Sequence, residues 1–276
     1  MIVCDSPPFV VLQPWKVAST TLYRRLQIYD CGRYPQGIVY DPKLGRDITR
    51  HLPQRDLAQF PEAERKYKRV TFLRNPYDRL YSGFLQRQKR VLTAQDRGDI
   101  TPALREEKAA IETGFHSFLE YYADPSSSSQ SVPGLYQQYE YVYWDGAFAV
   151  DFVGFLETFE ASYAQICDTL DIQGEQVLNA NVSNPDNILT STTLPSDARF
   201  RYIHQFDAST LALANSIYAE DFEGLCFRML LPTDNASEYM ELSPFSDAFI
   251  SEIDMSMVID DRAFGWHRTG GAAPAM

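Results

Sequence analysis

Two short apolar runs in the first third of the chain are each followed by polar residues and then by a helical pattern. The first run is Phe9 to Leu12, and the second is Val70 to Leu73. Such short continuous runs are typical of strands buried on both faces of a parallel sheet. After the first run, Leu22 and Leu26 recur at helical spacing, which predicts a strand, a turn and a helix. After the second run, Pro76 suits a first helical turn, where a backbone N–H is not needed.

The rest of the pattern also alternates between helices and short strands. We predict a strand at 37–40, a helix at 58–67, a strand at 69–74 and helices at 79–92, 103–122, 163–170 and 211–222. Alternation of this kind indicates an α/β fold with a central parallel sheet flanked by helices. A chain of 276 residues with 45% hydrophobic content is long enough for one large core of this class.

Both strand-to-helix junctions carry cationic and hydroxyl side chains. Lys16 lies in the first turn, just before a Ser-Thr-Thr run at 19–21, and Arg74 leaves the second strand eight positions before Ser82. The start of a helix attracts anions, because its first N–H groups lack intrahelical partners and the helix dipole is positive there. Two such junctions predict a ligand with two separated phosphate-like groups. The Walker A pattern is absent, so an ordinary NTPase is not indicated.

Each segment alone also fits a simpler interpretation. A lysine in a loop is usually a solvated surface residue, and the segment from Arg74 to Arg79 fits a helix start with an ion pair between successive turns. The order of the two segments, each behind an apolar run, favours the anion-binding interpretation.

The two segments resemble the 5'-phosphosulfate loop and the 3'-phosphate site of sulfotransferases that use 3'-phosphoadenosine 5'-phosphosulfate (PAPS). The resemblance is greatest to carbohydrate sulfotransferases and their bacterial relatives. The residues that match the two motifs are Lys16, Val17, Ala18, Ser19 and Thr20, followed by Arg74, Pro76, Arg79, Leu80 and Ser82. Trp15 departs from the family, which usually has proline there; the proline is shifted to Pro14.

Weaker similarity extends to roughly residue 227. The later elements that resemble the family are Gln138-Tyr139, the stretch 150–159, Asn181-Val182-Ser183 and Tyr218 to Phe222. The resemblance implies a P-loop-like three-layer fold and a sulfotransferase domain at 1–227. Residues 228–276 then form a C-terminal extension, either a lid or a partly disordered segment.

The resemblance also implies roles for the matched residues. Lys16 would stabilise the oxygen that bridges the phosphate and the sulfuryl group. Arg74 and Ser82 would hold the 3'-phosphate. The 5'-phosphate would be bound by the loop, whose residues are Lys16, Val17, Ala18, Ser19, Thr20 and Thr21. PAPS would be the sulfuryl donor, and the reaction needs no metal.

A general base is harder to assign. His51 is the best candidate, because it lies between the two motifs and an unperturbed histidine has a pKa near 6.5. A surface or helix-capping histidine is the alternative. His116 falls in an apolar stripe and is expected to be a core residue. The other candidates, since some sulfotransferases use a glutamate, are Glu106, Glu107 and Glu112.

Charge is divided unevenly along the chain, whose net charge is −12. Residues 1–110 carry a net charge of +8, and residues 111–276 carry −20. The positive half contains both predicted anion sites. The acidic half favours a small neutral or cationic acceptor over a polyanion, unless it is simply a solubilising surface. The 17 tyrosines suit cation–π binding, and one concrete hypothesis is a guanidinium natural product, as in cyanobacterial saxitoxin-type alkaloid sulfotransferases.

Two further functions are kept as alternatives: a carbohydrate O-sulfotransferase, and a noncatalytic nucleotide-binding or scaffolding module. No long apolar stretch or leader is evident, so a cytoplasmic enzyme of secondary-metabolite biosynthesis is expected. The expected partner is a small-molecule acceptor, with neither nucleic acid nor membrane. The cysteines form no metal-binding or disulfide pattern; they are Cys4, Cys31, Cys167 and Cys226.

Overall fold

The computed structural model divides the chain into two compact units. It describes residues 1–34, 37, 39–42, 45–57, 66–127, 137–174, 202, 205–225, 227, 229–232, 239–242 and 265–267. The first unit comprises Met1–Arg74, Tyr136–Ser196 and Ser246–Met276, and the second comprises Asn75–Leu135 and Asp197–Phe245. The chain therefore passes from the first unit to the second directly after Arg74.

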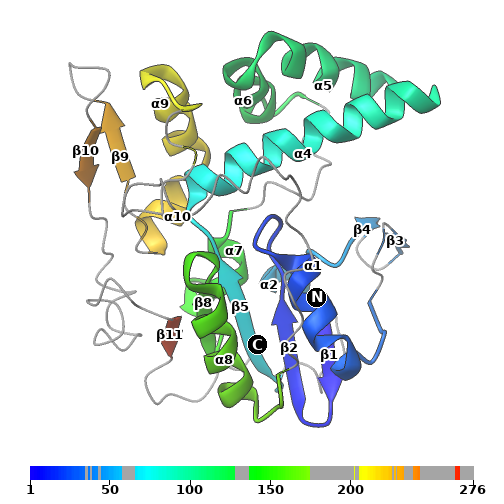
Figure 1. Ribbon diagram of the computed structural model, residues 1–276, viewed down its shortest axis with the longest axis vertical. Helices are drawn as coiled ribbons and strands as arrows, with labels where there is room; N and C mark the ends of the chain where they lie inside the picture. The colour runs from blue at the N-terminus through cyan, green and yellow to red at the C-terminus, as the bar shows by residue number, and fades with distance from the viewer. Residues whose placement is uncertain are drawn as a thin grey trace. The chain divides into compact units, whose positions relative to one another are not determined.

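A five-stranded sheet forms the centre of the first unit. Its order is β1-β2-β5-β8-β11, with bounds Ile2–Asp5, Pro8–Leu12, Lys68–Leu73, Phe152–Phe155 and Gly265–His267. The three inner strands are parallel, and each outer strand is antiparallel to its neighbour. Figure 1 shows these inner strands side by side, with α1 (Ser19–Leu26) and α8 (Phe159–Leu170) in front of them. The predicted α/β fold with a central parallel sheet is confirmed.

The core of this unit lies between the sheet and these two helices. Strand side chains that alternate toward α1 and α8 are fully buried there; the central ones are Phe9, Val11, Val70, Phe72 and Phe152. They meet Leu22 and Leu26 of α1 and Ile166 of α8. The helical spacing of Leu22 and Leu26 thus reflects one buried face, as the sequence predicts. Burial of these side chains holds α1 against the sheet, with residues 13–18 as the loop between β2 and α1.

Short elements complete the first unit. Two of them, α2 (Gln54–Leu57) and α7 (Tyr139–Val142), lie on the other face of the sheet (Figure 1). The others are η1 (Gln27–Tyr29), the pair β3 (Val39–Asp41) and β4 (Arg46–Ile48), the pair β6 (Tyr143–Trp144) and β7 (Ala147–Phe148), and η4 (Leu156–Thr158).

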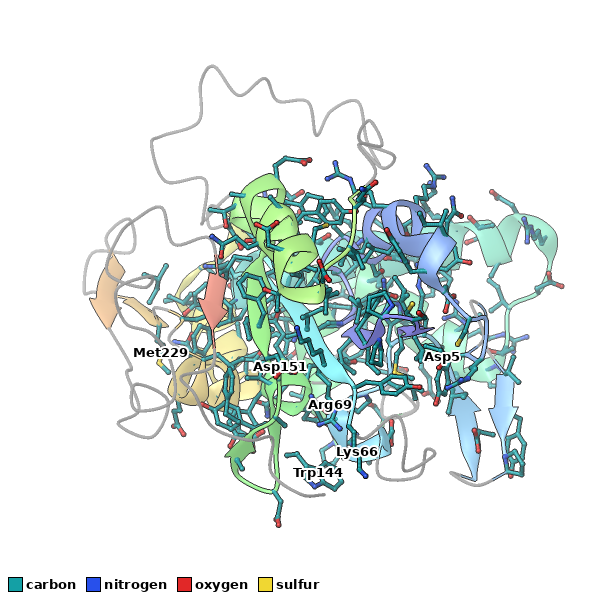
Figure 2. All side chains as sticks on the ribbon, turned by 90° about the horizontal axis from the view of Figure 1, so that it is seen from below. Asp5, Lys66, Arg69, Trp144, Asp151 and Met229 are labelled. Atoms are coloured by element: carbon teal, nitrogen blue, oxygen red, sulfur yellow. The ribbon has the colours of Figure 1, made fainter. Side chains whose placement is uncertain are left out.

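Arg69 and Asp151 join β5 and β8 where these strands begin. The Arg69 backbone N–H donates to the Asp151 carboxylate at 2.7 Å, and the Asp151 N–H donates to the Arg69 carbonyl at 2.7 Å. Figure 2 looks at this edge of the sheet and labels both residues. The pair sets the register in which Val70 lies opposite Phe152, so both strands end at the opposite edge.

The second unit is mainly helical. Its helices are α4 (Pro76–Arg97), α5 (Pro102–Thr113), α6 (Phe115–Ala123), α9 (Ala208–Ile217) and α10 (Ala219–Gly224), and a hairpin is formed by β9 (Met229–Pro232) and β10 (Tyr239–Leu242). Asn75 caps α4, because its side-chain oxygen accepts from Tyr77 N at 3.0 Å. A buried bidentate ion pair between Arg87 and Glu107 connects α4 to α5.

Several predicted boundaries differ from the structure. The helix predicted at 103–122 is two helices, because Gly114 has φ 133°, a value that side-chain-bearing residues rarely adopt. The helix predicted at 211–222 is likewise divided between α9 and α10 at Tyr218. The helix predicted at 58–67 falls largely on 58–65, which lie outside the described residues, and so does the Asn181-Val182-Ser183 element. The domain boundary at residue 227 stays a prediction, although β11 joins the sheet of the first unit.

Candidate anion-binding site

The loop after β2 has an unusual backbone conformation. Lys16 has φ 67° and Ala18 has φ 61°, so two side-chain-bearing residues are left-handed, separated only by Val17. Left-handed residues in a tight turn direct successive backbone N–H groups toward one point and make a concave anion-binding nest. Such conformations cost about 1 kcal/mol or more each, and they cluster at ligand-binding sites. The strain at Lys16 and Ala18 therefore points to a binding loop.

Helix α1 adds further donors to this loop. Its first intrahelical bond runs from Leu22 N to Ala18 O at 3.0 Å, so the N–H groups of residues 19–21 precede the helical ladder. Ala18, at the N-cap, has no side-chain oxygen to cap them. Ser19 and Thr21 are buried, while Thr20 is half-buried. The predicted loop and helix start are thus observed as a set of backbone donors with hydroxyl groups beside them.

Lys16 and Arg74 come together because β2 and β5 are parallel neighbours. Leu12 lies opposite Thr71, and the segments that follow them leave the sheet at the same edge. Arg74 Nη1 donates to Lys16 O at 3.4 Å. Burial, and secondly the charge of Arg74, lower the pKa of Lys16 to about 8. The Lys16 ammonium also lies 5.9 Å from the centroid of the Trp15 ring.

Arg50 is a third cation at this site. Its Nη2 donates to Thr20 Oγ1 at 3.1 Å, and burial lowers its pKa. Sequence reasoning did not select Arg50 as a site residue. Its position next to His51 could have indicated a site residue. Its contact with the loop, however, depends on the path of the chain between β4 and α2. Three cations therefore lie at the loop and the first turn of α1, and such a cluster of positive charge suits a multiply charged anion.

His51 is held beside the same loop by two backbone interactions. Its Nδ1 lies 2.7 Å from the backbone carbonyl oxygen of Gln13, and this geometry assigns the ring proton to Nδ1. Tyr141 Oη donates to the His51 carbonyl at 3.0 Å. The unperturbed histidine value near 6.5 does not apply to His51 in the free protein. Burial lowers the pKa of His51 to about 3, against the raising effect of the Gln13 bond, and the Met1 amino group, Arg50 and Lys16 lower it further.

The alternative bases are all in the second unit. His116 is half-exposed, so the expectation of a core histidine is wrong. Its Nδ1 lies 3.4 Å from Ser209 Oγ, and its Nε2 lies 3.4 Å from Glu120 Oε1. Both carboxylate oxygens of Glu107 accept from Arg87, which gives this residue a structural role. Glu112 is exposed and pairs with Lys108 at 2.5 Å, and Glu106 is also exposed.

Four of the five matched residues of the second motif belong to the second unit, which begins at Asn75. Ser82 is half-buried on α4, and its cooperation with Arg74 stays a prediction. Arg79 is fully buried, pairs with Asp221 at 3.4 Å and lies over the Tyr218 ring at 4.6 Å. It thereby joins the second motif to the later Tyr218-to-Phe222 element, a structural link that motif matching alone did not reveal.

Comparison with known protein families gives a match over most of the chain. The model of the sulfotransferase family matches residues 1–227. The chain belongs to the sulfotransferase family. No curated protein and no solved structure gives a match. Among the described residues of this sulfotransferase, no helix is long and apolar enough to cross a membrane.

Proposed function

We propose that this sulfotransferase transfers the sulfuryl group of PAPS to a small acceptor. One observation carries the proposal: Lys16 lies in a loop with two left-handed residues, Arg74 contacts this loop, and Arg50 contacts the uncapped first turn of α1 that follows it. Family membership supports sulfuryl transfer in general. The arrangement of cations and backbone donors suits a donor that carries several negative charges.

The loop would bind the 5'-phosphosulfate of the donor. The N–H groups at 19–21 and the left-handed residues supply backbone donors, and Thr20 adds a hydroxyl group. Arg74, with Ser82, would bind the 3'-phosphate. A guanidinium group suits this task, because its planar fork of N–H donors matches the geometry of a phosphate.

The reaction would be an in-line displacement at sulfur. A lone pair on an acceptor oxygen or nitrogen forms the new bond to sulfur, and the bond from sulfur to the bridging oxygen breaks. The other product is 3'-phosphoadenosine 5'-phosphate (PAP). Negative charge develops on the departing phosphate, where Lys16 would stabilise it electrostatically. Holding both reactants in line lowers the entropic part of the barrier.

His51 would accept the proton of the acceptor at Nε2, because its Nδ1 proton is held by Gln13 O. In the free protein the ring is neutral, and nearby cations oppose its protonation. The donor's negative charges would offset Lys16 and Arg50, and the pKa of His51 would therefore rise when PAPS binds. The base would thus gain strength when the donor is in place.

The acceptor we propose is small and neutral or cationic, which rests on the acidic second half of the chain. A guanidinium compound of the saxitoxin type and a neutral saccharide are the two acceptor classes to compare. The test is a transfer assay with labelled PAPS and both acceptor classes, with Lys16→Ala as the inactive control. Sulfated product from wild type alone supports the proposal, whereas PAP binding without turnover of any acceptor would favour a noncatalytic module.

A further inference from the structure

Gln138 makes an unusual two-point contact with the backbone of Arg74. Its side-chain Oε1 accepts from Arg74 N at 2.8 Å, and its Nε2 donates to Arg74 O at 2.8 Å. One amide side chain therefore binds both polar backbone groups of a single residue. This is the pattern by which one strand pairs with the next in a sheet.

The contact begins where the sheet ends. The pairing of β5 with β2 reaches Thr71, and its pairing with β8 reaches Leu73. Arg74 is the next residue and the last of the first unit. Gln138 thus extends the ordered backbone of β5 by one residue, up to the cation proposed to bind the donor.

Gln138 is fully buried, so loss of this contact is expected to be costly. Buried backbone groups require partners, and losing one partner leaves the other group unsatisfied at considerable cost. The Gln138 backbone is held in turn at the start of α7, where Tyr141 N donates to Gln138 O at 2.9 Å. The Arg74 backbone therefore has one well-defined position.

The position of that backbone directs the Arg74 side chain. Its guanidinium reaches Lys16 O at 3.4 Å, so it lies against the left-handed loop. We propose that Gln138 is a positioning residue for donor binding: its amide fixes the Arg74 backbone, and so presents the guanidinium to the anion. This inference rests on the proposed function, because it takes Arg74 as a donor-binding residue.

A double-mutant cycle tests it, with PAP as the titrated ligand. The proteins are wild type, Gln138→Met, Arg74→Ala and the double variant. Methionine has a similar volume to glutamine but makes neither hydrogen bond. We expect Gln138→Met to weaken PAP binding about tenfold in the wild-type background and less than about twofold when Arg74 is alanine. If Gln138 had a merely structural role, Gln138→Met would weaken PAP binding in the Arg74→Ala background as well.

Gln54→Met is a matched control. Gln54 is also fully buried in the first unit, and its Nε2 donates to the carbonyls of Tyr141 and Ala149 at 3.3 and 3.1 Å. This variant is expected to lower the melting temperature, as Gln138→Met does, but to change the PAP dissociation constant by less than about twofold. If Gln138→Met does not fold, the same cycle is made with Gln138→Asn, whose shorter side chain cannot reach both backbone groups.

The outcomes separate this inference from the function on which it rests. Wild-type protein that does not bind PAP contradicts the proposed function. Wild-type protein that binds PAP, with unchanged affinity in the position-138 variant, overturns the inference alone. An equal loss of affinity with and without the Arg74 side chain overturns it as well, since Gln138 would then act independently of Arg74.

Discussion

Gln13 connects His51 to the anion-binding loop. Its backbone carbonyl oxygen lies 2.7 Å from His51 Nδ1, and its side-chain Nε2 donates to Ser19 O at 3.2 Å. Gln13 is fully buried, at the position directly after β2. One residue at the end of a central strand therefore orients the proposed base and also holds the first turn of α1. This arrangement leaves Nε2 as the ring nitrogen that can accept a proton.

The low pKa of His51 predicts a particular pH profile. With a pKa of about 3, the His51 ring in the free protein stays neutral from neutral pH down to well below pH 6. We therefore expect kcat/KM for the donor to show no His51-dependent fall between about pH 7.5 and 5.5, because this parameter reports groups of the free enzyme. His51→Ala should lower kcat by about a hundredfold or more with little change in PAP affinity. A wild-type kcat in this variant would assign the base to another residue.

Removing Lys16 should nearly abolish transfer. Lys16→Ala takes away the ammonium that would stabilise the departing phosphate, and losses of about a hundredfold to a thousandfold in kcat are typical of such groups. Steady-state transfer of labelled sulfuryl measures the effect. Circular dichroism controls for folding, since the left-handed backbone at position 16 also accommodates alanine only with strain. Turnover like that of wild type would refute the assigned role.

PAP affinity should also depend on pH through Lys16. The pKa of Lys16 in the free protein is about 8, and the protonated form is the one that attracts an anion. Affinity should therefore be nearly constant from pH 6.5 to about pH 7.5 and fall as the pH rises above about 8. Lys16→Met, which lacks the titrating group, should bind PAP weakly with a flatter profile over the same range. A wild-type affinity that rises above pH 8 would contradict this explanation.

Breaking the Arg79–Asp221 pair should destabilise the second unit. The side chains are 1% and 0% exposed, so Asp221→Ala leaves a buried guanidinium without its carboxylate. Removing one partner of a buried pair typically costs about 3–5 kcal/mol. Urea unfolding measures the loss. Glu112→Ala, which removes an exposed pair with Lys108, is the control and should cost about 0.5 kcal/mol or less. A loss of unfolding free energy for Asp221→Ala as small as that for Glu112→Ala would show that the Arg79–Asp221 pair contributes little.

The sequence predicted the parts of this molecule that depend on local pattern. The apolar runs became β2 and β5, and the Lys16 loop and Arg74 met at one edge of the sheet, because parallel strands end together. The antiparallel outer strands β1 and β11 were not predicted. Local patterns do not show which distant segment, such as Gly265–His267, will pair with a sheet edge.

The parts that were missed depend on tertiary contacts. Arg50 was not selected, and Gln138 was matched to the family only as part of the Gln138-Tyr139 pair, without a role at the site. Both reach the site only through the folding of the chain around the sheet. The pKa of His51 follows mainly from burial, which a local sequence pattern does not reveal; of the neighbouring groups that lower it further, only Arg50 is adjacent in sequence. Arg79 fits a binding motif by spacing, yet its burial against Asp221 gives it a structural role.

The central claim is that the site binds a 3'-phosphorylated donor, and calorimetric titration tests it most directly. PAP and AMP, which lacks the 3'-phosphate, are titrated into wild-type protein and into Arg74→Ala. The account predicts tight PAP binding and weak AMP binding by wild type, with a loss of about tenfold or more for PAP and a much smaller loss for AMP in Arg74→Ala. Equal binding of the two nucleotides by wild type, or no binding of either, would contradict it.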